Sequence, residues 1–190
     1  MSESKPTAAA RIRGSAAELF YREGIRAVGV EQIVTSAGVT KPSLYRSFPS
    51  KDALAACYLR DYDARFWQRF DAAAAAHPGA PRAQIAAFLR PLAERAAKTG
   101  FRGCGLTNAA VEYPEQGHPA RKVSESSKNE LRRRLRALAR EMGAPDALGD
   151  GLLLLIEGAY VSGQLFGAGG PAVAVAEAAD RLIGAWLPGA

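Results

Sequence analysis

The amino-acid sequence predicts an all-α protein of about nine helices, in which a small N-terminal three-helix domain precedes a larger helical domain. Apolar residues recur at helical spacing along nearly the whole chain, and no run alternates with period two for long enough to form a strand. The 19 Gly and 11 Pro lie mainly between the apolar stretches, where helices are expected to end. No unit of 20–50 residues repeats, which excludes a solenoid.

The first three predicted helices are short and lie within residues 7–48. The first carries an apolar face that starts at Ile12; Thr7 is placed to cap its beginning and Gly24 to end it. The second covers the stretch before Gly38. The third is shorter still, and Leu44 and Phe48 are its inward-facing residues.

The larger domain is predicted to open with a long helix that Ser50 caps and that runs to residue 76. A helix over 81–98 follows, and Pro91 inside it is expected to kink or break it. The remaining helices are expected at 104–113, from the PEQGHP loop to Gly143, at 146–167 and at 171–187. The predicted domains are therefore residues 1–50 and 51–190.

The charge of the chain is unevenly distributed. The formal net charge is +6; residues 1–60 carry nine Lys/Arg against five Asp/Glu, and residues 121–140 carry eight against two. A basic N-terminal third favours a polyanionic partner at that end of the chain. The arginines of 132–136 are interpreted instead as a solvated helix face.

The cysteine pattern and the apolar segments indicate a cytoplasmic, reduced protein outside the membrane. Cys57 and Cys104 form no C-x-x-C pair, which excludes a disulfide scaffold and a cysteine-rich zinc site. The N-terminus has no apolar core of a signal peptide. The most apolar stretch, 151–170, is interrupted by Glu157 and by glycines.

Residues 29–54 carry the most informative pattern, a short helix, a glycine-containing turn and a second short helix, which is the layout of a helix-turn-helix. The outward side of the second helix combines hydroxyls, bases and a phenol, groups that reach phosphates and base edges in a major groove. These residues are Thr40, Lys41, Ser43, Tyr45 and Arg46. Lys51 follows at a helix N-terminus, where a phosphate is also favoured.

This segment resembles the DNA-binding domain of the TetR/AcrR transcriptional regulators. The matched positions are Ile33, Ala37, Gly38, Val39, Thr40, Leu44, Tyr45, Phe48, Lys51 and Leu54, with Ala16, Ala17, Leu19, Phe20 and Gly24 upstream. Departures from the pattern are Gly29, Val34 and Pro42. Farther along, Gly103–Arg121 is similar to a segment found in a subset of these regulators.

The resemblance implies a repressor that binds a pseudo-palindromic double-stranded DNA operator as a homodimer. A small-molecule effector is expected to release it from the operator, and no cofactor is expected. By family position, Thr40, Lys41, Ser43, Tyr45 and Lys51 contact DNA, with Tyr45 and Lys51 on phosphates, and Arg46 is a further candidate. The last two helices, rich in Gly and Ala, are expected to form the dimer interface.

The effector pocket is expected between the long fourth helix and the helices that follow it. The candidate lining residues are Tyr62, Phe66, Phe88, Leu92, Leu106, Asn108, Tyr113, Tyr160 and Phe166. An aromatic stripe at this spacing is also typical of plain core, and Asn108 with Glu112 also suits an interhelical hydrogen bond. Cys104 is either an inert small hydrophobe or a redox sensor.

Two other classes of function compete with a DNA-binding regulator. An enzyme would have to use Cys104 or His118, but the chain has no Ser-His-Asp order, phosphate loop or H-E-x-x-H motif. A metal site built from Cys104, Glu112 and His118 lacks the usual spacing. The alternative to operator binding is a helical small-molecule-binding or interaction protein that does not act through sequence-specific DNA binding.

Overall fold

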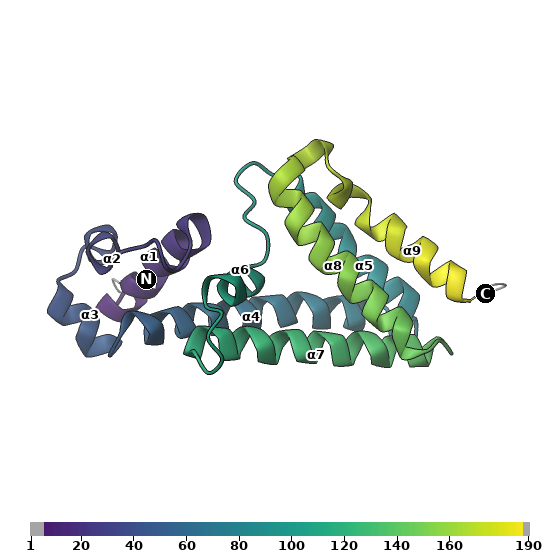
Figure 1. Cartoon of the computed structure of the whole chain (residues 1–190), viewed down its shortest axis with the longest axis horizontal. Helices are drawn as coiled ribbons and strands as arrows, with labels where there is room; N and C mark the ends of the chain where they lie inside the picture. Colours follow the sequence, from purple (N-terminus) through teal and green to yellow (C-terminus); the bar gives the residue numbers. More distant parts are fainter. Residues whose placement is uncertain (1–5, 188–190) are drawn as a thin grey trace, which may run out of the picture. The chain divides into compact units, whose positions relative to one another are not determined.

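The computed structural model describes residues 6–187, which form nine α-helices and two short 3-10 turns and contain no strand (Figure 1). The all-α prediction is therefore confirmed. The helices are α1 (Ala8–Glu23), α2 (Val30–Ala37), α3 (Lys41–Ser47), α4 (Lys51–Ala76), α5 (Pro81–Ala96), α6 (Gly105–Glu112), α7 (Pro119–Glu141), α8 (Asp146–Phe166) and α9 (Val175–Trp186), with 3-10 turns η1 (Gly167–Gly169) and η2 (Pro171–Ala174) between the last two.

The chain divides into two compact units that do not follow the predicted boundary at residue 50. The first unit comprises the residues up to 63 together with 105–125, and the second comprises 64–104 and the residues from 126 onward. Helices α4 and α7 therefore contribute to both units. The predicted division into 1–50 and 51–190 stays a prediction about which part contacts DNA.

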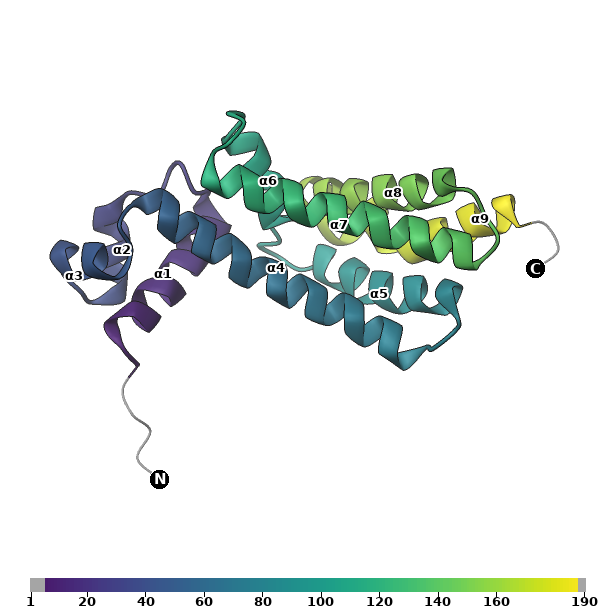
Figure 2. The same cartoon turned by 90° about the horizontal axis from the view of Figure 1, so that it is seen from below.

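In the first unit, α1, α2 and α3 gather beside the first turns of α4 (Figures 1 and 2). Ile12, Phe20 and Leu44 form part of the shared core, and Ile12 and Leu44 are fully buried. The helix starts are capped by hydroxyls, as predicted for Thr7 and Ser50: Thr7 Oγ1 accepts from the Ala10 amide at 3.2 Å and Ser50 Oγ from the Ala53 amide at 3.0 Å.

In the second unit, α5, α8 and α9 pack on one another and bury Leu92, Ile156 and Ile183. Gly149 allows α8 to approach α7 closely, since a Cβ at this position would lie 2.6 Å from the Arg136 backbone nitrogen. Helix α8 with η1, Asp146–Gly169, is long and apolar enough to cross a membrane by length and composition alone. In the second unit, one side of this helix packs against α5 and α9.

The structure corrects three local expectations. Pro91 does not break α5, which continues to Ala96; the proline side chain lies on the exposed side of the helix. Phe48 lies just beyond α3 as its C-cap and is only half-buried. The last helix begins at Val175, because η2 occupies the first residues of the predicted span.

Candidate functional site

The polar side of α3 is presented to solvent while its apolar side is buried. Leu44 is fully buried, whereas its neighbour Tyr45 is 48% exposed. Lys41 and Arg46 are also exposed, and Ser43 is half-buried. The alternation places phenol, ammonium and guanidinium groups on the outer surface of the first unit, as the sequence predicted.

The turn before α3 has the conformation that a helix-turn-helix requires. Gly38 adopts the left-handed region with φ 60°, and the Thr40 hydroxyl caps α3 by accepting from the Ser43 amide at 3.4 Å. Pro42 is accommodated in the first turn of α3. Arg11 supports the turn by donating from Nη1 to the Gly38 carbonyl at 3.2 Å, a role that its position in α1 gave no reason to expect.

Two of the predicted DNA-contact cations already have partners within the first unit. Lys41 forms an ion pair with Glu31 of α2, and hydrogen bonding to that carboxylate raises the pKa of Lys41. Lys51 donates from Nζ to the Arg26 carbonyl at 3.1 Å, and burial lowers its pKa. Both ammonium groups keep further N–H donors for a phosphate.

The turn between α1 and α2 is joined to the end of α6. The Arg26 amide donates to Glu112 Oε2 at 2.7 Å, and Arg26 Nη1 donates to the Glu112 carbonyl at 3.0 Å. The sequence offered Glu112 either a ligand role or an interhelical hydrogen bond. Its carboxylate serves the second purpose, with a turn 86 residues away as its partner.

Tyr113 and His118 pack together beside this contact. Their rings stack with centroids 3.9 Å apart, and burial raises the pKa of Tyr113 to about 12. His118 Nδ1 accepts from the Ala120 amide at 3.2 Å, which confirms its capping position at the start of α7, and its Nε2 lies 3.6 Å from Asp52 Oδ2. The imidazole is thus held between α4 and α7.

Comparison with known proteins identifies the family. The family model for bacterial regulatory proteins of the tetR family matches residues 12–56. The chain is 30% identical to the transcriptional regulator AcuR of Cereibacter sphaeroides over 158 residues, which cover 78% of this chain and 72% of that protein. The chain belongs to the TetR family of transcriptional regulators. TetR-family proteins are non-enzymatic, DNA-binding transcription regulators, so the prediction that the chain is not an enzyme is confirmed.

Solved structures of TetR-family regulators share the whole fold. A TetR-family regulator from Streptomyces coelicolor is 33% identical, with a TM-score of 0.84 over 95% of this chain and 94% of that one. A regulatory protein TetR from Rhodobacter sphaeroides is 26% identical, with a TM-score of 0.76 over 94% and 97% of the two chains. The similarity therefore extends well beyond the helix-turn-helix.

The predicted pocket residues of this TetR regulator are divided between the two units. Tyr62, Leu106, Asn108 and Tyr113 belong to the first unit, and Phe66, Phe88, Leu92, Tyr160 and Phe166 to the second. Phe166 is 60% exposed at the end of α8, and its role in lining a pocket stays a prediction. Phe66, Leu92 and Tyr160 are buried, and the space beside Phe88 and Leu135 measures only about 10 Å³, which favours the interpretation as plain core.

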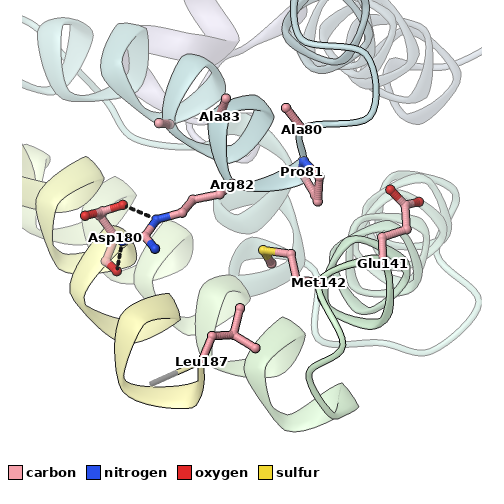
Figure 3. A pocket seen from close by; sticks show the side chains of 9 residues that line it. Ala80, Pro81, Arg82, Ala83, Glu141, Met142, Asp180 and Leu187 are labelled. Atoms are coloured by element: carbon pink, nitrogen blue, oxygen red, sulfur yellow. Dashed lines mark hydrogen bonds and ion pairs between the residues drawn. The ribbon is translucent and has the colours of Figure 1, made fainter. Parts of the chain in front are cut away.

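A larger cavity, of about 570 Å³, lies elsewhere in the second unit of this TetR regulator (Figure 3). It lies where the start of α5, the end of α7 and α9 meet, and Met142 and Leu187 face it together with Pro81. On one wall Arg82 Nε donates to Asp180 Oδ1 at 2.7 Å. The apolar periodicity used in the sequence analysis could not find this cavity, since its lining comes from helix ends.

Cys104 is buried beside a charged pair in the second unit. Its sulfur lies 3.4 Å from Lys128 Nζ, and the same ammonium donates to Glu157 Oε1 at 2.5 Å. Both acceptors raise the pKa of Lys128 against the opposing effect of its burial. Redox sensing by Cys104 stays a prediction. Among residues 6–187, no group of three His, Cys, Asp or Glu side chains is arranged to hold a metal ion.

Helix α8 carries an exposed apolar stripe. Leu154 and Leu165 are 74% and 70% exposed, and Val161 is also exposed between them. Together with Gly158 they follow helical spacing along one side of α8. Exposed apolar stripes of this kind are typical of interaction surfaces.

Proposed function

We propose that the chain is a ligand-responsive repressor that binds a pseudo-palindromic operator as a homodimer and leaves it when a small-molecule effector binds. The observation that carries the DNA-binding part is the orientation of α3, whose apolar residue Leu44 is buried while Tyr45 and Arg46 are exposed. A helix that exposes basic and phenolic side chains on one face is suited to enter the major groove of DNA.

The dimer is supported by the apolar stripe on α8. Its Leu154 and Leu165 are large apolar side chains that solvent contacts in the single chain. A twofold axis would place each stripe against its own copy. The operator half-sites that such a dimer would contact, one with each α3, lie roughly 34–36 Å apart. Because its proposed target is an operator in bacterial DNA, this dimer is proposed to act in the cytoplasm.

The effector part rests on the second unit and on α4. The cavity of about 570 Å³ between α5, α7 and α9 has the size that small-molecule sites usually have. Helix α4 begins in the first unit and ends in the second, so it offers a continuous connection. An effector that favours a conformer with wrongly spaced α3 helices would lower operator affinity, typically by roughly 5- to 150-fold.

Selection of binding sites from random duplex DNA, followed by fluorescence anisotropy on the selected sequence, tests the proposal. We expect a two-half-site consensus, and binding that weakens steeply with salt. Binding with the same affinity to scrambled duplexes would instead support a helical interaction protein that does not read DNA sequence. Native mass spectrometry of the purified dimer would identify a retained effector.

A further inference from the structure

The turn between α1 and α2 is held by charged groups from two other elements of the first unit. The Arg26 amide donates to Glu112 Oε2 at 2.7 Å, and the Arg26 guanidinium donates to the Glu112 carbonyl at 3.0 Å. Lys51 Nζ donates to the Arg26 carbonyl at 3.1 Å. We call these three residues and their hydrogen bonds the turn clamp.

The backbone around Arg26 is shaped to receive the Glu112 carboxylate. Gly24 has φ +93°, and a Cβ at this position would lie 3.2 Å from Glu112 Oε1. The glycine therefore serves both the backbone conformation and the close approach of the carboxylate. In return, the Arg26 guanidinium binds the Glu112 carbonyl at the end of α6, a position where a helix leaves carbonyls without partners.

The turn clamp connects α6 to a residue that we assign to DNA binding. Glu112 accepts from the Arg26 amide and Lys51 donates to the Arg26 carbonyl, so Glu112 holds the residue whose carbonyl receives the Lys51 ammonium. Lys51 stands at the first position of α4, after α3 and its C-cap. Loss of the Glu112 contact would therefore release the turn on one side and the ammonium on the other.

Helix α6 is also fixed tightly at its other end. A Cβ on Gly105 would lie 2.7 Å from Tyr58 Oη of α4, so α6 has little room to slide. Residue 104, directly before it, belongs to the second unit. This close contact at the start of α6 and the Arg26 contact at its end hold the helix at both ends.

We propose that Glu112 is a positioning residue for operator binding: it holds the α1–α2 turn and, through Arg26, the Lys51 ammonium. This inference rests on the proposed function. It makes an unusual prediction about charge, because removing an acidic side chain from a DNA-binding protein ordinarily strengthens binding. Here removal of Glu112 must weaken it.

The test compares Glu112→Ala with Glu112→Gln, which removes the charge but keeps an oxygen acceptor for the Arg26 amide. Val111→Ala, at a neighbouring residue that is 77% exposed, is the matched control. Operator affinity is measured by anisotropy on DNA selected by the wild-type chain. We expect Glu112→Ala to weaken binding about tenfold or more, as loss of a hydrogen bond to a charged group implies, and to lower the salt slope by up to one unit. Glu112→Gln, which keeps a neutral acceptor, should weaken binding less than Glu112→Ala does, and Val111→Ala should remain near wild type.

Hydrogen exchange of the Arg26 amide provides a second measurement that needs no DNA. The exchange should accelerate about tenfold or more in Glu112→Ala and stay unchanged in Val111→Ala. If it does not accelerate, the turn clamp does not exist in solution and the inference fails. Accelerated exchange with unchanged or tighter operator binding would equally overturn the positioning role.

The two measurements also separate this inference from the proposed function. If the wild-type chain selects no DNA sequence while Arg26 exchange still accelerates in Glu112→Ala, the operator function has failed and the inference fails with it. If the wild type binds an operator, reciprocity of linkage requires that operator DNA slow the exchange of the Arg26 amide. The absence of that slowing would contradict the inference alone.

Discussion

The exposed stripe on α8 predicts that Leu154→Glu abolishes dimerisation. Leu154 is 74% exposed in the single chain, so a partner would cover about three quarters of its side chain. Burial of a whole leucine is worth about 1.5–3 kcal/mol, which gives roughly 1–2 kcal/mol for this residue. In a twofold interface each substitution counts twice, so even Leu154→Ala should cost roughly 2–4 kcal/mol, or about 30- to 1,000-fold in the dimer dissociation constant.

Leu154→Glu adds the cost of burying two carboxylates and should exceed this range. Sedimentation velocity over a concentration series measures the dissociation constant of the dimer. Anisotropy on operator DNA measures the accompanying loss of operator affinity, because a monomer carries one α3 and leaves the second half-site unoccupied. Val111→Glu is the matched control, because Val111 is 77% exposed on α6 and lies outside the stripe. A Leu154→Glu chain that stays as dimeric as the wild type would refute the assignment of α8 to the interface.

Three further predictions concern DNA contact, close packing and acid stability. Tyr45→Ala should weaken operator binding with no loss of thermal stability, since the side chain is 48% exposed, and Tyr45→Phe should show by anisotropy how much of the loss belongs to the hydroxyl. Gly149→Ala should lower the free energy of unfolding, measured in urea, by about 1–3 kcal/mol, because the new Cβ would lie 2.6 Å from the Arg136 backbone nitrogen. Gly14→Ala is the control: the space around Gly14 is open, so this substitution should not destabilise α1. Hydrogen bonds from two arginines lower the pKa of Glu130 to about 2, below its ordinary value of 4.5. The stabilising contribution of Glu130 is therefore present above pH 4.5 and is lost as the pH falls towards 2. Glu130→Gln should flatten that part of a plot of the urea unfolding midpoint against pH.

Features that depend on a few neighbouring residues could be predicted from the sequence. The caps by Thr7 and Ser50 and the left-handed Gly38 each involve residues within four positions of one another, so local chemistry decides them. The inward Leu44 and outward Tyr45 follow from helical periodicity in the same way. These features make up most of the candidate DNA-binding surface.

Features that depend on distant partners could not be predicted. The contact between Arg26 and Glu112 joins residues 86 positions apart, and nothing in the spacing of either residue points to the other. Pro91 suggested a break in α5, but its ring faces outward and tertiary packing keeps the helix continuous. Phe166 continues the aromatic pattern of the predicted pocket residues, but helical spacing alone does not show that its side chain is exposed at the end of α8.

Ion pairing explains why the density of basic residues is a poor guide to the positive charge that this chain offers to a partner. The most basic stretch is in α7, yet Arg132 and Arg136 both hydrogen-bond to Asp150, and Arg134 binds Asp71. These bonds hold the Asp150 pKa far below its ordinary value and neutralise much of the local field. On α3, by contrast, Arg46 forms no ion pair among residues 6–187, and Lys41 is paired only with the exposed Glu31. On α3, Arg46 therefore offers a guanidinium outside any ion pair of the described residues to a phosphate, although α3 has far fewer basic residues than α7.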